Sequence, residues 1–251
     1  MTVRLADVSG EAVLLAGAGR AILLQIAHPA VGRGVARHSD FSSDPLRRLR
    51  NTLTYVYVVV YGTPEEVARI ARAVNATHVQ VRGDQYDASD PDLQLWVAAT
   101  LYQTAIEVYE RVVGPLPPED VEQLYRDYAV LGTTLTMSPG LWPKDTEAFR
   151  KYWLSTLATL RVDDEVLAVS RALLHPTGGP WWIRRMMPLV RLITAGLLDE
   201  SLRTTFELPW DARRQRRFDR TMRMMARTNR ILPARLRHWP REHYLARFRR
   251  A

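Results

Sequence analysis

The sequence predicts an all-α protein, and three observations support that fold class. First, helix-start signals recur in which a capping residue precedes proline and acidic residues, and Thr63-Pro64-Glu65-Glu66 is the clearest of them. Second, apolar residues return every three or four positions after such starts. Third, the intervening segments are short, without internal repeats or low-complexity tracts. We therefore expect a single domain of roughly eight to ten helices over residues 1–251.

Length and composition limit the class of protein. A chain of 251 residues, 47% of them hydrophobic, can bury a sizeable core, and disorder is not expected. The absence of cysteine excludes a disulfide framework, a thiolate metal site, a cysteine nucleophile and the thiolate-ligated haem of P450 enzymes. Asp7 and Glu11 precede the first apolar run, where a secretory signal would be basic, so we expect a cytoplasmic protein.

Positive charge is concentrated in the C-terminal segment, residues 203–251. The formal net charge of the chain is +8, and this segment holds 15 arginines against 4 acidic residues, a surplus of +11. Such a segment can contact anionic lipid or nucleic acid. A solvated helical face is the simpler interpretation and the one we expect, with peripheral membrane contact as the alternative; we do not expect nucleic acid.

The first third of the chain predicts long helices. Residues 9–31 are apolar and compatible with a helix. In LTYVYVVVYG, residues 53–62, local propensity favours a strand, but the length of the segment and the Arg-rich turns before it favour a buried helix that ends at Gly62. Thr63 then caps a helix that ends near Gly83. The apolar stripe of that helix consists of Val67, Ala71, Val74, His78 and Val81.

Proline, glycine and acidic residues mark the later helix boundaries. The clearest are Asp90-Pro91, Gly114-Pro115, Pro117-Pro118 and Asp145-Thr146. HPTGGPWW, residues 175–182, is the strongest break. It is compatible with a hinge or a domain seam, and with a packed turn whose tryptophans are buried, which we expect. Helices over about 183–206 and 211–232 precede a segment broken by Pro233 and Pro240.

Motifs for several other chemistries are incomplete. Gly17-Ala18-Gly19 lacks the third glycine of a dinucleotide-binding loop, because Ile22 stands in its place, and no βαβ alternation follows. We expect these glycines to permit close helix packing. The sequence has no His-Glu-x-x-His zinc motif, no histidine pair at metal-ligand spacing on one helix and no Gly-x-Ser-x-Gly motif.

His78 stands out among the six histidines because it lies on an apolar helical stripe. A histidine in that position is commonly a hydrogen-bonded core residue. The alternative is an axial haem ligand, since haem needs one imidazole presented from an apolar wall, a wide apolar slot, and cations for its propionates. The residues alone leave both interpretations open.

Arg48 and Thr52 are four residues apart and therefore share one face of a helix. A surface arginine beside a helical threonine is one interpretation. The functional alternative is a fixed cation and a hydroxyl that reach into a pocket and polarise dioxygen or a substrate oxygen.

Four stretches taken together resemble a known family. In chain order they are GRAILLQIAHPAVGRGVARHSDF, DPLRRLRNTLTYVYVVVYGTPEEV, THVQVRG and YDASDPDLQLWVAATLYQTAIEVYERVVGPL. Their order and spacing resemble the MpaB-like oxygenases and the rubber oxygenases (latex-clearing proteins) over about residues 10–160. The resemblance rests on the whole set, because no single stretch would suffice.

This resemblance implies an all-helical fold around a pocket for one haem b. The family's proximal iron ligand is the histidine of a His-x-x-Val-x-Gly-like stretch, which here begins at His78. The family's Arg-x-x-x-Thr pair near the haem falls on Arg48 and Thr52. Its His-Pro and His-Ser pairs fall on His28-Pro29 and His38-Ser39, which we expect to be structural or pocket-lining.

One position departs from the rubber oxygenases. They carry a lysine just before the threonine, which can occupy the distal iron position, and here that residue is Asn51. The departure argues against a rubber-type distal site, and the compactness of the chain argues against polyisoprene as the substrate. The resulting hypothesis is a haem-dependent oxygenase that acts on dioxygen and a small apolar, alkene-type substrate. His78 would hold the iron, and Arg48 and Thr52 would orient dioxygen or the substrate.

Two other classes of function stay open. A haem protein with peroxidase, dehydrogenase or sensing chemistry would use the same iron ligand. A non-enzymatic helical protein would instead dock on lipid or nucleic acid through its basic C-terminus. Haem absorbance separates this last class from the other two.

Overall fold

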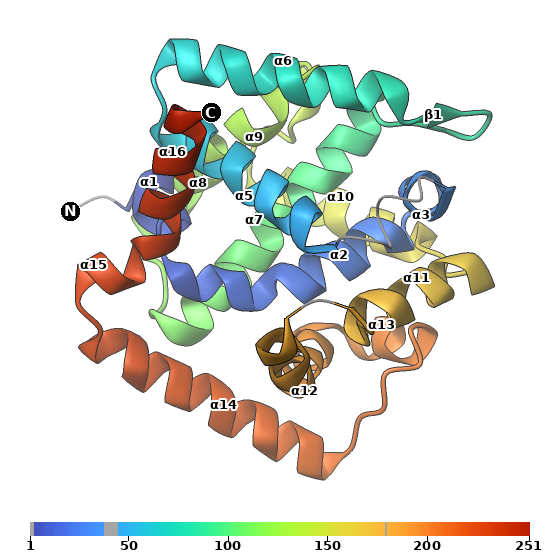
Figure 1. Cartoon of the computed structure of the whole chain (residues 1–251), viewed down its shortest axis with the longest axis vertical. Helices are drawn as coiled ribbons and strands as arrows, with labels where there is room; N and C mark the ends of the chain where they lie inside the picture. The colour runs from blue at the N-terminus through green and yellow to red at the C-terminus, as the bar shows by residue number, and fades with distance from the viewer. Residues whose placement is uncertain (1–2, 38–44, 179) are drawn as a thin grey trace.

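The computed structural model describes residues 3–37, 45–178 and 180–251, without the side chains of residues 45 and 46, and confirms the all-α class. Figure 1 shows the helices packed around α7 (Pro91–Val112). Within the described ranges the one sheet is a hairpin in which β1 (Arg82–Gly83) pairs antiparallel with β2 (Tyr86–Asp87). The first helices are α1 (Leu5–Ser9), the 3-10 helix η1 (Ala12–Gly17), α2 (Ala18–Ala27), α3 (Pro29–Arg37), α5 (Pro45–Tyr61) and α6 (Pro64–Gln80). After α7 come α8 (Pro118–Tyr128), α9 (Val130–Thr133), η2 (Pro139–Leu141), α10 (Thr146–Thr159), α11 (Asp164–Leu174), α12 (Trp181–Leu197), α13 (Glu200–Thr205), α14 (Ala212–Ile231), α15 (Ala234–Arg237) and α16 (Trp239–Arg250).

Helix α7 forms the axis of the core. It begins as predicted, because the Asp90 carboxylate accepts a hydrogen bond of 2.8 Å from the backbone N–H of Asp92, and Pro91 occupies the first turn. The helix packs against η1, α2, α9 and α14, and its Trp96 is buried. Its Tyr102 meets the ring of Tyr128 edge-on, with ring centroids 5.1 Å apart. A long helix buried on several sides gives the other helices a common surface to pack on.

The predicted helical stretch over residues 9–31 is divided by a sharp corner at His28 and Pro29. Residues Ala12–Ala27 and α3 meet there at 102°. Proline lacks the N–H that would continue the ladder of α2, and it drives the preceding residue toward extended backbone, which His28 adopts. Among the described helices, no single one is long and apolar enough to cross a membrane, although this bent pair passes that test by length and composition alone.

Gly17 and Gly19 bring η1 and α2 close to two other helices. A Cβ atom at Gly17 would collide with the side chain of Thr104 on α7, and one at Gly19 would collide with Thr194 on α12. A larger residue at either position would therefore force the helices apart. The expectation that these glycines serve packing is confirmed.

Helices α5 and α6 pack against each other and carry the predicted site residues. The segment LTYVYVVVYG is helical, as predicted, and its Tyr57 and Val58 are buried in the core. The phenol of Tyr55 donates a hydrogen bond of 2.6 Å to the carbonyl oxygen of Leu131. The predicted start of α6 is also confirmed, because Thr63 caps the helix in a reciprocal arrangement with Glu66.

The basic C-terminal segment folds back onto the body of the protein. Helix α16 packs on α5, where the rings of Tyr57 and Tyr244 lie 6.0 Å apart. Arg249 Nε lies 2.9 Å from the Glu66 carboxylate at the start of α6. Most arginines of α14 are exposed, which agrees with the expected solvated helical face. Figure 1 shows α14 crossing the lower end of the molecule before α15 and α16 return upward.

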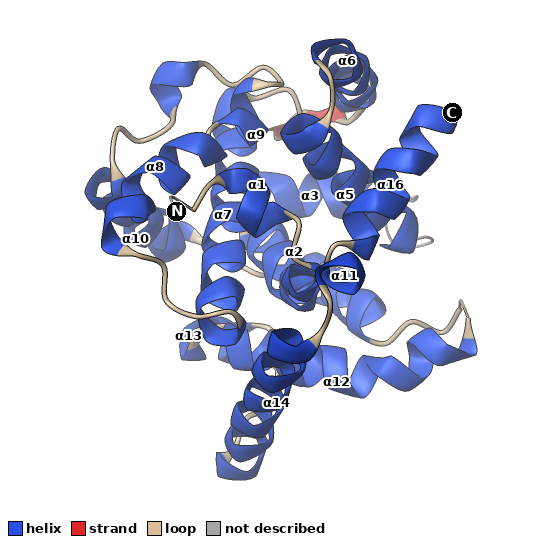
Figure 2. Ribbon diagram, turned by 90° about the vertical axis from the view of Figure 1, so that its left-hand side faces the viewer, coloured by secondary structure: helices blue, strands red, loops and turns tan. Residues whose placement is uncertain are grey.

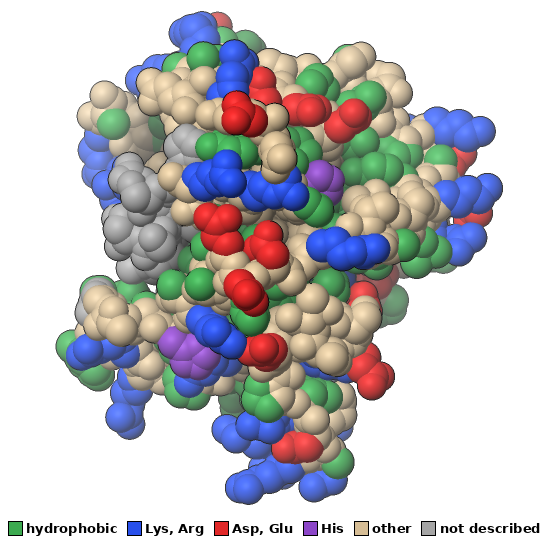
Figure 3. Space-filling model, turned by 90° about the vertical axis from the view of Figure 1, so that its right-hand side faces the viewer, with side chains coloured by type: hydrophobic (Ala, Val, Ile, Leu, Met, Phe, Trp, Pro, Cys, Tyr) green, Lys and Arg blue, Asp and Glu red, His purple; other side chains and the backbone are tan. Residues whose placement is uncertain are grey.

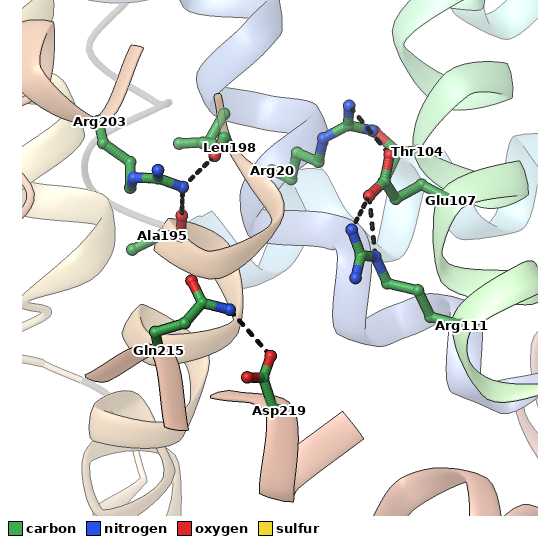
Figure 4. A network of polar contacts seen from close by, with 9 residues as sticks. All are labelled: Arg20, Thr104, Glu107, Arg111, Ala195, Leu198, Arg203, Gln215 and Asp219. Atoms are coloured by element: carbon green, nitrogen blue, oxygen red, sulfur yellow. Dashed lines mark hydrogen bonds and ion pairs between the residues drawn. The ribbon is translucent and has the colours of Figure 1, made fainter. Parts of the chain in front are cut away.

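A buried arginine joins α2 to α7 (Figure 4). Arg20 is 4% exposed, and its Nη1 donates to the hydroxyl of Thr104 at 3.2 Å. Its Nη2 lies 3.8 Å from the Glu107 carboxylate, which also accepts a 2.7 Å hydrogen bond from Arg111. Burial lowers the pKa of Arg20, and the charges of Glu107 and Asp199 oppose that shift. The contact keeps a desolvated cation paired at the point where the two helices meet.

Two expectations are corrected by the structure. The described residues form more helices than the eight to ten expected, because short pieces such as α1, α9, α13 and α15 are separated by breaks that the apolar pattern does not reveal. The tryptophans of HPTGGPWW are not buried, since Trp181 and Trp182 lie at the exposed start of α12. That start projects past the helices that cover the rest of α12, and no sequence pattern indicates this.

Replacing Glu107 by leucine is expected to lower the free energy of unfolding by about 3 kcal/mol, because Arg20 would keep its buried charge without its main counter-charge. Urea unfolding followed by circular dichroism measures the loss. Glu110→Leu, at an exposed position of the same helix, is the control and should change stability by about 0.5 kcal/mol or less. Equal losses in the two variants would contradict the role given to the pair.

Candidate functional site

His78 lies in the last turn of α6, on the stripe that the sequence predicts. All five stripe residues are half-buried, whereas most other positions of α6 are exposed; the five are Val67, Ala71, Val74, His78 and Val81. The backbone carbonyl of His78 accepts a 2.9 Å hydrogen bond from the N–H of Val81, which closes the helix. The imidazole is therefore presented from an apolar face at a fixed helix end, and the described chain leaves that face partly uncovered.

The surroundings of His78 favour a neutral imidazole. Burial is the main cause that lowers its pKa, and the charge of Arg48 lowers the pKa further, while Asp87 acts in the opposite direction. Its Nδ1 is buried without a hydrogen-bond partner among the described residues, and so is Oδ1 of Asn75, one turn earlier. A buried polar atom without a partner is costly in an apolar setting. The neutral form of imidazole is also the form that binds a metal ion.

Arg48 and Thr52 are both half-buried on α5, and the structure places Arg48 close enough to affect the titration of His78. Burial lowers the pKa of Arg48 to about 10, so the guanidinium remains charged at neutral pH. No hydrogen bond within the described ranges joins Thr52 to His78. The exposed Asn51 side chain, at the position of the rubber-oxygenase lysine, is the least buried of the three.

The hairpin after α6 is held against α3. A Cβ atom at Gly34 would lie 3.1 Å from the ring of Tyr86, and one at Gly83 would lie 2.7 Å from the same ring. Arg33 donates a hydrogen bond to Gln85 in the turn of the hairpin. The His-Pro corner at the start of α3 thus supports the end of α6 that carries His78.

The other histidines lie in different environments. His28 caps the end of α2, is half-buried, and has its pKa lowered mainly by burial. His175 is exposed at the end of α11, His238 contacts Glu11, and His243 stacks on Trp239. The predicted His38-Ser39 pair lies outside the described residues.

Two cavities are described, and neither is lined by His78, Arg48 or Thr52. The larger, about 840 Å³, lies beside α1, α5, α8 and α9, with Val59 and the buried Trp142 in its wall. The smaller, about 300 Å³, lies between α7 and α10 and is lined by His28, Trp96 and Tyr152. The sequence located neither cavity, because their walls combine residues distant in the chain, although His28 was expected to be structural or pocket-lining. A haem pocket beside His78 stays a prediction.

A family model confirms the resemblance inferred from the sequence motifs. The model is described as ER-bound oxygenase mpaB/B'/rubber oxygenase, catalytic domain, and it matches residues 6–227. The chain belongs to the mpaB and rubber-oxygenase family. The match extends past the region 10–160 in which the motifs were recognised and includes most of α14. It therefore covers every predicted site residue.

Two curated relatives are similar to the chain over most of its length. An uncharacterised protein of Mycobacterium tuberculosis and one of Mycobacterium bovis are each 35% identical to the chain over 224 residues. The aligned region covers 85% of this chain and 88% of each relative. No solved structure matches the chain. The family description thus supports an oxygenase catalytic domain, and the roles of individual residues rest on the geometry above.

Arg48→Gln is expected to raise the pKa of His78, because it removes a positive charge that disfavours the imidazolium form. Asp87→Asn is the matched variant of opposite sign and is expected to lower the same pKa. An NMR titration of the imidazole in protein without added haemin measures both.

Because the folded-state pKa of His78 is depressed, His78 contributes stability above its unfolded pKa, and this stability is lost as the pH falls through the folded value. Arg48→Gln should therefore reduce the loss of stability at acid pH that comes from His78. If the pKa of His78 is unchanged in Arg48→Gln, the placement of Arg48 close to His78 is contradicted.

Proposed function

We propose that this protein is a haem b-dependent oxygenase that uses dioxygen to oxidise or cleave a small apolar, alkene-type substrate, with His78 as the axial iron ligand. The observation that carries the proposal is a neutral imidazole on a half-buried apolar stripe, with a buried ring nitrogen that has no partner in the described chain and a charged Arg48 close by. Membership of an oxygenase catalytic-domain family supplies the reaction class.

The single protein ligand that a haem needs is present in the chain. Among the described residues no group of three His, Asp or Glu side chains could hold a metal ion. Haem needs a single protein ligand, because its porphyrin supplies four nitrogens, so one imidazole is sufficient. The half-buried imidazole of His78, which its surroundings favour in the neutral form, could supply that ligand. A flat apolar group on the stripe of α6 would also cover side chains that the described chain leaves half-exposed.

His78, Arg48 and Thr52 would each have a different role, set by the chemistry of the side chain. Bound haem would supply the iron at which dioxygen is activated. His78 would hold that iron from α6, and as a neutral ligand it gives less electron donation than a thiolate, which favours addition of dioxygen over P450-like hydroxylation. Arg48 offers a desolvated positive charge, and Thr52 offers a hydroxyl on the same face of α5. Both would orient oxygen atoms of dioxygen or of the substrate.

The first test is the absorption spectrum of the purified protein. We expect a Soret band in wild type, or after addition of haemin, and its loss in His78→Ala. His175→Ala is the matched control and should keep the band, since His175 is exposed. Added imidazole should restore the band to a His78→Gly variant that remains folded by circular dichroism. A wild-type protein that takes up no haemin would overturn the proposal.

The second test separates an oxygenase from a haem protein with peroxidase, dehydrogenase or sensing chemistry. Oxygen consumption with a small alkene probe, without added peroxide, is the result expected for an oxygenase. Arg48→Gln and Thr52→Ala should each reduce kcat by about a hundredfold to a thousandfold while the Soret band persists, because each removes a donor to the reacting oxygen. Turnover that requires peroxide, or full activity in both variants, would contradict the assignment.

A further inference from the structure

The first two turns of α12 project from the body of the protein. Figure 2 shows this half of the helix running to the edge of the molecule, whereas the other half is buried against α2 and α14. Trp181, Trp182 and Met186 are 70%, 55% and 47% exposed. Three large apolar side chains exposed next to one another mark a binding surface more often than a surface without a partner.

Helical geometry spreads these side chains over about half of the circumference of α12. Trp181 and Arg185 are four residues apart, and so are Trp182 and Met186, so both pairs are neighbours on the helix surface. Arg184 flanks them and is also exposed. Trp181, Trp182, Arg184, Arg185 and Met186 are called the tryptophan face below. The core-facing side of the same helix begins at Met187, which is 8% exposed.

The exposed charges on the tryptophan face itself, Arg184 and Arg185, are positive. Between Glu165 and Asp199 the sequence holds four arginines and no acidic residue. Figure 3 shows several lysine and arginine side chains, with acidic side chains among them, toward the lower edge of the molecule, which is the end that α12 and α14 occupy in Figure 1. The occupant that complements this face therefore combines negative charge with an apolar layer.

We propose that the tryptophan face docks the protein on an anionic lipid surface. Indole rings prefer the boundary between headgroups and acyl chains, where their apolar body is buried and their N–H remains hydrated. Met186 would insert beside them, and the two arginines would meet the lipid phosphates. The proposal does not depend on haem binding. It assigns the membrane contact to the start of α12, whereas the sequence suggested the Arg-rich C-terminus as the alternative.

Two other occupants fit this face less well. A second copy of the chain, joined through a two-fold contact, would bring Arg184 and Arg185 of both copies together without an acidic partner in that stretch. A nucleic acid would satisfy the arginines, but its phosphates would leave Met186 without an apolar partner. The C-terminal segment also exposes Trp239, at 58%, but this ring stacks on His243 at a centroid distance of 5.0 Å.

The test is co-sedimentation of the full chain with vesicles of phosphatidylcholine alone or mixed with phosphatidylglycerol. We expect binding to the mixed vesicles that weakens with salt, and its loss in Trp181→Ser/Trp182→Ser. Arg184→Gln/Arg185→Gln should bind about 20- to 30-fold more weakly, since each basic residue near an anionic surface contributes about fivefold in affinity. All the replaced side chains are exposed, so the variants should keep the wild-type circular dichroism.

Matched variants in the C-terminal segment serve as controls. Trp239→Ser removes a comparably exposed tryptophan, and Arg216→Gln/Arg217→Gln removes the same charge from α14. Both should bind the mixed vesicles nearly as wild type does. Absence of vesicle binding, or equal losses in the controls, would overturn the proposal. Two other results would also overturn it if the protein does not bind vesicles. One is binding of duplex DNA that depends on the tryptophan face, and the other is a dimer, seen by analytical ultracentrifugation, that depends on the same face.

Discussion

The close approach of η1 and α2 to α7 and α12 is the constraint on which the rest of the structure depends. Gly17 and Gly19 make the approach possible, because neither position has room for a Cβ atom. Arg20 makes it specific, because a buried guanidinium needs the hydroxyl of Thr104 and the carboxylate of Glu107 at that place. A different register between the helices would leave the arginine desolvated and unpaired.

This packing reaches the candidate site through the corner that follows α2. Because α2 is fixed against the core, Pro29 directs α3 against the hairpin that follows α6, where Gly34 accommodates the ring of Tyr86. The hairpin that carries Tyr86 begins just after the last turn of α6, which contains His78. The other end of α6 is held by the capping arrangement of Thr63 with Glu66, and Glu66 also binds Arg249 of α16. His78 is thus positioned from both ends of its helix.

The two proposals concern different parts of the molecule and are physically compatible. The candidate haem site lies on α5 and α6, and the tryptophan face lies on the free half of α12. Apolar substrates partition into lipid, so docking would place the proposed oxygenase at the surface where such substrates are concentrated. This connection rests on both proposals.

Local sequence determined the helices and the family. Caps, prolines and apolar spacing predicted the starts of α6, α7 and α10 and the helical state of LTYVYVVVYG, because these signals act within one or two turns. The stripe of His78 was also predictable, since its residues repeat along one helix. Motif order identified the family because it needs no spatial information.

Tertiary structure alone decided how the elements meet. The influence of Arg48 on His78 and the pairing of Arg20 with Glu107 both depend on contacts between segments distant in the chain. For the same reason the sequence misplaced Trp181 and Trp182. An apolar side chain is buried only if another element covers it, and the start of α12 extends beyond the helices that cover its other half.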